Sequence, residues 1–150
     1  MKDAILKYFE DRFGIKVSPG FKLYTDQKGR VFLGPHLSFE PVSVGMQIAT
    51  IEGADRIRPS TSFLQLFGKH ATKNYISLTK EQTQAYAKGD DLSLNQEQAS
   101  HARDGYVLLK YLEYPLGCGL LKTEKEGSKG RILSIRNVLP KARRMRMDFL

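Results

Sequence analysis

The sequence predicts an α+β protein in which a small helix-and-hairpin unit precedes a small mixed β-barrel with short helices. Two patterns predict this order: a helical apolar stripe followed by a hairpin near the start, and a second half rich in short strands. The 150 residues suffice for one domain, or for two small ones that share a core. We place the boundary after residue 57, which divides the chain into 1–57 and 58–150.

The first unit begins with a predicted helix over residues 3–13, because Ile5, Phe9 and Phe13 recur at every fourth position. Gly14 fits a left-handed cap behind it. Residues 21–24 and 30–33 predict two strands that flank a hairpin loop at 26–29. Between 35 and 58, Pro and Gly separate short apolar stretches, which favours strands over helices.

The second unit alternates short helices with strands. A helix is predicted at 60–67, ending at Gly68, and another follows a capping box of Thr79 and Gln82 and ends at Gly89. We expect 105–112 to pair antiparallel with 116–122, and both faces of this pair to be at least partly covered. The predicted strands are 74–78, 91–94, 105–112, 116–122 and 131–135, with a turn at 113–115 and a charged loop at 123–130.

Positive charge is concentrated at the C-terminus. From residue 129 onward, seven basic residues stand against one acid, which accounts for +6 of the formal net charge of +8. Such a local positive field most often faces a phosphate backbone. Apolar residues such as Ile132 and Leu139 lie between the cations and can anchor the segment to a fold. The alternative is a solvated basic terminus that has no partner.

Composition narrows the class of protein further. A hydrophobic content of 41% with 27% charged residues is typical of a globular chain. No apolar run approaches the roughly 20 residues of a membrane span, and the N-terminus does not resemble a signal peptide. Pro140 interrupts any amphipathic helix in the basic segment, which argues against a membrane surface. The single cysteine allows no internal disulfide, so we expect a cytoplasmic protein.

The sequence offers little for catalysis. The three histidines lie more than 30 residues apart, and none forms a metal-type pair with Cys118. Cys118 lies between two glycines in an apolar strand, where we expect a buried thiol and not a nucleophile. No Walker loop or dinucleotide fingerprint is present, and the adjacent acids Asp90 and Asp91 are expected to face water. We therefore expect no enzyme activity, no metal and no cofactor.

Three segments in matching order resemble the PUA-like RNA-binding domain of the RsmF and Sun-type RNA cytosine-5 methyltransferases. Residues 78–92 are similar to that family's helix ending in an aromatic, a basic residue, a glycine and an acid. Residues 105–119 resemble a strand pair whose second strand opens with Pro-Leu-Gly. Residues 136–144 resemble the closing Asn-x-x-Pro-Lys-Gly-x-Arg signature. The resemblance covers about residues 58–150 and implies a PUA-like barrel that binds RNA.

The resemblance, together with the charge pattern, implies a set of RNA-binding residues. Asn137 could read a base edge or pin the final turn, and both roles stay open. Ala142 stands where the family has glycine and Leu139 where it has an aromatic ring, so the ring that could stack on a base is absent. We interpret Pro115-Leu116-Gly117 as a tight strand entry that serves packing. The expected RNA-binding residues are Lys69, Lys73, Lys88, Gly89, Arg131, Arg136, Asn137, Lys141, Arg143, Arg144 and Arg146.

The family's methyltransferases also carry an S-adenosylmethionine domain with a catalytic Pro-Cys pair, and this sequence shows neither. The sequence therefore predicts a free-standing, non-catalytic protein that recognises structured ribosomal or transfer RNA in RNA modification or ribosome biogenesis. One alternative is a protein-interaction subunit that delivers RNA to a separately encoded methyltransferase. Another is an enzyme, which would need a polar pocket with shifted titrating groups.

Overall fold

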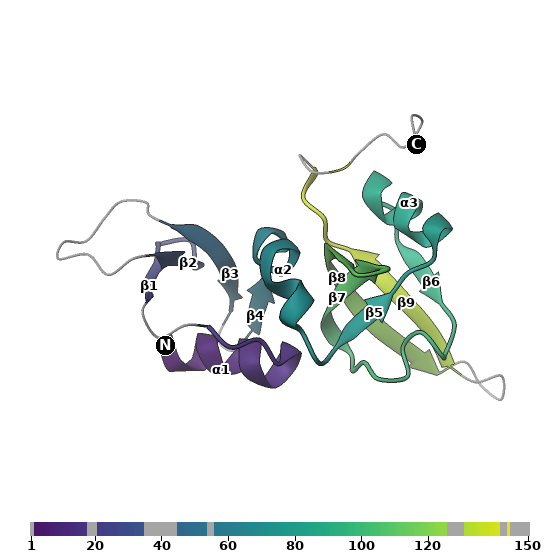
Figure 1. Cartoon of the computed structure of the whole chain (residues 1–150), viewed down its shortest axis with the longest axis horizontal. Coiled ribbons are helices and arrows are strands. Elements are labelled where there is room, and N and C mark those ends of the chain that lie inside the picture. Colours follow the sequence, from purple (N-terminus) through teal and green to yellow (C-terminus); the bar gives the residue numbers. More distant parts are fainter. Residues whose placement is uncertain are drawn as a thin grey trace.

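A computed structural model describes residues 2–17, 21–34, 45–53, 56–125, 131–141 and 144. Two sheets lie beside one another along the long axis, with one helix between them (Figure 1). This mixture of helices and sheets is the predicted α+β class. In chain order the elements are α1 (Lys2–Phe13), β1 (Lys22–Thr25), β2 (Arg30–Gly34), β3 (Met46–Glu52), β4 (Arg56–Pro59), α2 (Thr61–Phe67), η1 (Gly68–His70), β5 (Tyr75–Ser77), α3 (Lys80–Lys88), β6 (Leu92–Leu94), β7 (Gly105–Tyr111), β8 (Tyr114–Lys125) and β9 (Arg131–Asn137).

The first sheet is an antiparallel meander in the order β1-β2-β3-β4. Its opening hairpin confirms the predicted pair of strands, and Asp26 holds the loop by accepting backbone N–H bonds from Lys28 and Arg30, each 2.9 Å long. Helix α1 confirms the predicted helix, and its stripe of Ile5, Phe9 and Phe13 is buried. Strands β3 and β4 confirm the preference for strand in the described part of 35–58, whereas residues 35–44 and 54–55 lie outside the described residues.

Helix α2 begins where a hydroxyl cap is predicted. The Ser60 hydroxyl accepts a hydrogen bond from the Phe63 N–H at 3.1 Å and donates one to the Gln47 carbonyl at 2.6 Å. The second bond ties the helix to β3. Gly68 ends the helix as predicted, but the chain stays right-handed there and continues through the short turn η1. The small size of Gly68 serves packing, because an added Cβ would lie 2.9 Å from the Cβ of Pro115.

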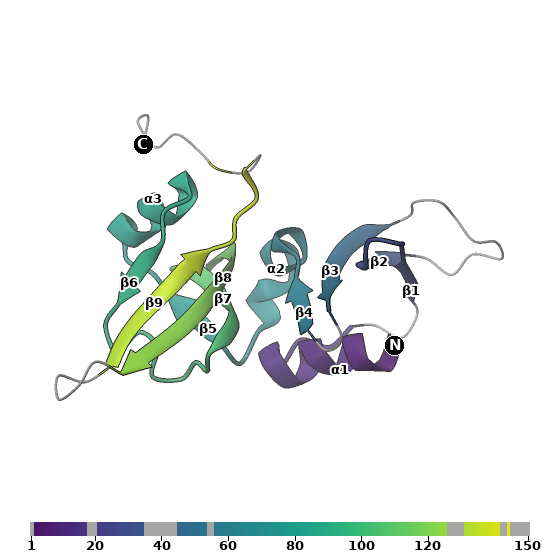
Figure 2. The same cartoon turned by 180° about the vertical axis from the view of Figure 1, so that it is seen from behind.

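The second sheet has the order β5-β7-β8-β9-β6 and curls into a half-barrel. Strand β5 runs parallel to β7, and all other neighbours are antiparallel. In both views, α3 and the segment that follows β9 lie at the same upper edge of this sheet (Figure 2). The arrangement matches the predicted mixed β-barrel with short helices.

The half-barrel buries both of its faces, as predicted for the central strand pair. Tyr106 and Leu108 of β7 belong to a core that includes α1, α2 and the first sheet. Val107 and Leu109, which point the opposite way, belong to a second core that includes α3 and β9. Helix α2 has neighbours in both β3 and β8, so the two sheets share a continuous apolar interior.

The last three strands differ from the prediction in where they begin or end. The turn lies at Leu112 and Glu113, not at 113–115, because Leu112 adopts a left-handed φ of 54° and reverses the chain earlier. Strand β8 therefore begins at Tyr114 and includes Pro115, which sits at a register shift opposite Lys110 where a missing N–H is tolerated. At its far end β8 pairs with β9 as far as Lys125, so the expected loop begins later. Strand β9 extends to Asn137.

Candidate nucleic-acid interface

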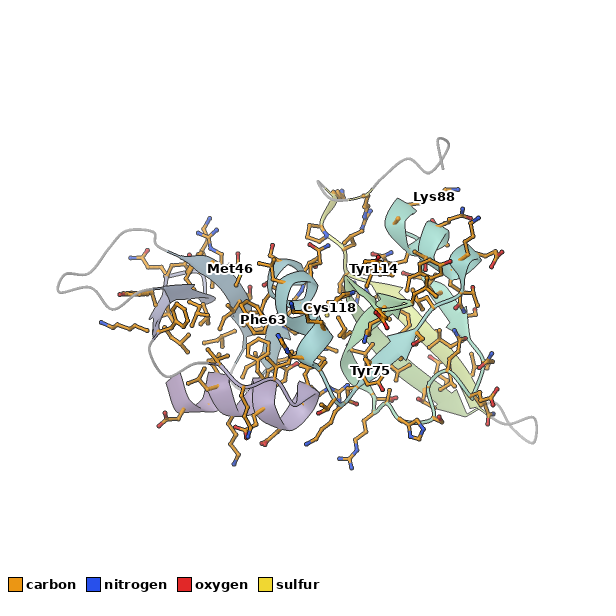
Figure 3. The ribbon with its side chains drawn as sticks, viewed as in Figure 1. Met46, Phe63, Tyr75, Lys88, Tyr114 and Cys118 are labelled. Carbon is orange, nitrogen blue, oxygen red and sulfur yellow. The ribbon has the colours of Figure 1, made fainter. Side chains whose placement is uncertain are left out.

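The C-terminal end of α3 is built by a capping box and a left-handed glycine. Thr79 and Gln82 exchange side-chain and backbone hydrogen bonds at its start, as predicted. At its end Gly89 adopts a φ of 102°, and its N–H donates to the Tyr86 carbonyl at 3.0 Å. This conformation reverses the chain directly after the exposed Lys88, which Figure 3 shows at the upper edge of the molecule. The helix therefore presents a cation directly before a left-handed backbone turn.

Asn137, the last residue of β9, joins this turn to the end of the sheet. Its side-chain amide donates to the carbonyls of Tyr86 at 2.9 Å and Asp90 at 2.8 Å. Its Oδ1 accepts the N–H of Leu139 at 2.9 Å, and its own N–H donates to the Asp91 carboxylate at 2.8 Å. Asn137 is buried, so these bonds use the amide within the fold. Of the two roles left open by the sequence, the geometry fits pinning the final turn.

Arg144 lies across this turn. Its Nε donates to the carbonyl of Leu139 at 3.3 Å, and its N–H donates to the carbonyl of Lys141 at 3.3 Å. A Cβ added at Gly89 would lie 2.6 Å from Cδ and 2.7 Å from Nε of Arg144. Because Gly89 has no side chain, the exposed side chain of Arg144 can lie against the backbone of this turn. Lys88, Gly89, Lys141 and Arg144 form one surface, which we call the α3 edge.

The segment after β9 is anchored from two sides. Leu139 is buried in the second core. At this position, where an aromatic ring is expected from the family, the aliphatic side chain therefore anchors the segment by packing. Arg58 of β4 donates to the Val138 carbonyl at 3.2 Å and lies 3.6 Å from the Glu52 carboxylate. The first sheet therefore supports the segment that carries Lys141. Nothing in the local sequence around Arg58 indicates this bond, because the two residues are 80 positions apart.

The remaining predicted residues do not join the α3 edge. Arg136 is exposed on β9, but it points to the opposite face from Ile135 and Asn137. Lys69 and Lys73 are exposed on the stretch between α2 and β5, away from α3. Arg131 lies at the far end of β9, opposite Lys125. Arg143 and Arg146 lie outside the described residues.

The Pro115-Leu116-Gly117 stretch serves packing, which agrees with its interpretation as a tight strand entry. Gly117 has a φ of 152°, and an added Cβ would lie 2.6 Å from the hydroxyl of Tyr86. That buried hydroxyl donates to the Cys118 carbonyl at 2.8 Å and so connects α3 to β8. Burial raises the pKa of the Cys118 thiol to about 12, as expected for a small buried side chain (Figure 3).

Asp90 and Asp91 are exposed, as expected, and Asp91 also orients Asn137. His70 and His101 are exposed, whereas His36 lies outside the described residues. Within the described ranges, no three His, Cys, Asp or Glu residues come together in a way that could hold a metal ion. In that same part of the chain, no helix is both long enough and apolar enough to cross a bilayer.

A curled five-stranded sheet with a short helix at its edge agrees with a PUA-like fold. Residues 73–145 match the family model described as the methyltransferase RsmF PUA domain. This part of the chain is therefore a PUA-like domain of the RsmF family, as the motifs predicted. The match begins after α2, later than residue 58. A search of curated proteins finds no relative of this chain.

Proposed function

We propose that this protein recognises structured ribosomal or transfer RNA through the α3 edge and acts in RNA modification or ribosome biogenesis in the cytoplasm. The observation that carries the proposal is the arrangement of Lys88, Lys141 and Arg144 around the Gly89 turn. The Asn137 bonds hold that turn in place, so little order has to be gained on binding. The guanidinium of Arg144 and the ammonium groups of Lys88 and Lys141 suit phosphate oxygens.

The two nearby acids reduce the charge of the α3 edge without cancelling it. The Asp91 carboxylate already accepts the Asn137 N–H, and Asp90 is exposed. Contacts with the phosphate backbone carry no sequence information by themselves. Preference for folded RNA would then come from the shape of the surface, which includes the rigid turn at Gly89. The role needs no metal or cofactor.

Affinity for a folded transfer RNA tests this proposal. Lys88→Ala and the double variant K141A/R144A should each weaken binding, the double variant by about tenfold or more, because each lost phosphate contact lowers the electrostatic part of the affinity. Lys28→Ala on the β1–β2 hairpin is the matched control, since it removes an equally exposed lysine far from α3. Binding by K141A/R144A that equals the control, or equal affinity of the wild type for unfolded RNA, would contradict the proposal.

A second candidate function is delivery of RNA to a separately encoded methyltransferase. The observation that favours a protein partner is the exposure of large apolar side chains at the β7–β8 turn, where Leu112 and Tyr114 are each 69% exposed. A photo-crosslinking amino acid placed at Tyr114 would test it. Capture of an RNA methyltransferase, identified by mass spectrometry and lost in Leu112→Asp, would support delivery. Recovery of uncrosslinked protein alone would contradict it.

A further inference from the structure

A second cationic surface lies at the C-terminal end of α1. A pocket of about 530 Å³ opens there between the helix and the loops that precede β5 and β7, and its lining includes Tyr8, Asp11, Arg12, Lys73, His101 and Arg103. Three permanent cations therefore face one carboxylate. The volume falls in the range of ordinary ligand sites. The family match does not explain this pocket, because Tyr8 and Arg12 lie outside the matched residues.

Arg12 is the best-fixed cation of this pocket. Its Nε donates to the Tyr106 carbonyl at 2.8 Å, and its Nη2 donates to the Arg103 carbonyl at 2.6 Å. Both partners are neutral, and no carboxylate of the described residues lies within 4.0 Å of the guanidinium. Partial burial lowers the pKa of Arg12, and nearby Arg103 acts in the same direction, whereas Tyr8, Cys118 and Asp104 act to raise it. A positive charge in this position is stabilised by an anion.

The pocket is held in shape by Asn74. Its side-chain amide donates to the Arg12 carbonyl at 2.6 Å, and its Oδ1 accepts the Arg103 N–H at 2.8 Å. The N–H of Lys73 donates to the carbonyl of Phe13 at 3.3 Å. These bonds place α1, Lys73 and Arg103 around one opening before any ligand arrives. Lys73 and Arg103 are exposed, and the Lys73 ammonium makes one long bond, of 3.5 Å, to the Asp11 carbonyl, so both charged groups can reach an incoming anion.

We propose that this α1 pocket binds a phosphate of the RNA backbone as a second contact, in addition to the α3 edge. The inference rests on the proposed function for the identity of the ligand. Phosphate oxygens accept several hydrogen bonds at once, which suits two arginines and a lysine around one opening. In both views the end of α1 lies at the lower edge of the molecule and α3 at the upper edge (Figure 1, Figure 2). An RNA bound at both surfaces would therefore have to extend across the molecule, from the PUA-like half-barrel to the N-terminal helix.

Fluorescence anisotropy with a labelled, folded transfer RNA tests the pocket. The double variant K73E/R103E should weaken binding about tenfold or more and reduce the salt dependence by one to two ion equivalents. The control K28E/K122E makes the same change in net charge at exposed positions outside both surfaces and should weaken binding less than about threefold. Unfolding curves of both variants check that each remains folded. Arg12 is left intact, since its side chain bonds β7 and the loop before it.

The RNA affinities of K73E/R103E and K141A/R144A together separate the α1 pocket from the α3 edge. Binding by K73E/R103E that matches the control, while K141A/R144A remains weak, would overturn the pocket and leave the α3 edge standing. Wild-type affinity in both K73E/R103E and K141A/R144A would overturn the proposed function as well. AMP and a polyglutamate peptide provide further probes. If either binds in a way that depends on Lys73 and Arg103 while RNA affinity is unchanged in K73E/R103E, the pocket serves a nucleotide or an acidic protein, and the inference is wrong.

Discussion

At the scale of single residues, the C-terminal segment depends most on Asn137. This buried side chain donates to one carbonyl of α3 and to one carbonyl of the turn after α3. It also accepts one N–H from the chain after β9. A buried polar group that loses its partner costs more free energy than an exposed one, because water cannot replace the lost bond. The residue that looked able to read a base therefore acts by holding other residues in place.

Asn137→Ala should lower the free energy of unfolding by about 2–3 kcal/mol, because it removes the side-chain bonds to Tyr86 and Asp90 and leaves the buried N–H of Leu139 without its acceptor. Asn95→Ala removes an exposed asparagine that makes a local bond to the Gln98 N–H, and it should cost less than about 1 kcal/mol. Urea unfolding measures both. Equal stability losses in the two variants would mean that the bonds of Asn137 do not hold the turn.

Cys118 provides a prediction about pH. Its pKa is raised to about 12 in the folded protein, chiefly by burial, whereas an unfolded thiol titrates near 8.5. The stabilisation is therefore complete below about pH 8.5 and decreases as the pH rises from there towards 12. The urea midpoint should fall between about pH 8.5 and 9.5, which is below the range in which unfolded tyrosines ionise.

The control for this prediction is Cys118→Ala, in which the fall of the midpoint over that pH interval should be absent or much smaller. The folded wild type should also resist alkylation by iodoacetamide at pH 8, and react once it is unfolded, because the thiolate is the reacting form. Rapid alkylation of the native protein would show that the thiol is accessible and ionised, and would contradict its buried position.

At the scale of elements, the end of α3 combines a helix cap with the placement of Arg144. Gly89→Ala introduces a Cβ at a φ of 102°, which is unfavourable for any residue with a side chain, and directs it at Arg144. The substitution should cost about 1 kcal/mol of stability and weaken RNA binding. In an Arg144→Ala background the backbone strain should remain while the effect on RNA binding disappears. Equal effects on RNA binding in both backgrounds would contradict the contact.

Most elements could be predicted from the sequence, since hydrophobic periodicity, the Thr79–Gln82 capping box and the glycine caps are local signals. The strand ends near Leu112 and Lys125 could not, because pairing with a neighbouring strand decides them. The grouping of Lys88, Gly89, Lys141 and Arg144 was within reach of the family motifs. The bonds of Arg58 to Val138 and of Arg12 to Tyr106 were not, since their partners lie 80 and 94 positions away.

At the scale of the whole molecule, the N-terminal elements are structurally linked to the PUA-like half-barrel. One core joins α1, the first sheet, α2 and one face of β7 and β8. Arg12 and Arg58 add hydrogen bonds from the first elements to the half-barrel and to the segment after it. A surface that includes both parts can therefore stay rigid on binding, which limits the entropy lost with the RNA.

The salt dependence of RNA binding tests the central claim most directly. If the basic C-terminal segment meets about four phosphates, the log–log slope of affinity against salt for a folded transfer RNA should be roughly −3 to −4, and K141A/R144A should flatten it by about 1 to 2 units. The folded stability of that variant should change little, because exposed cations contribute little to it. An unchanged slope in K141A/R144A would contradict the claim that the α3 edge contacts RNA.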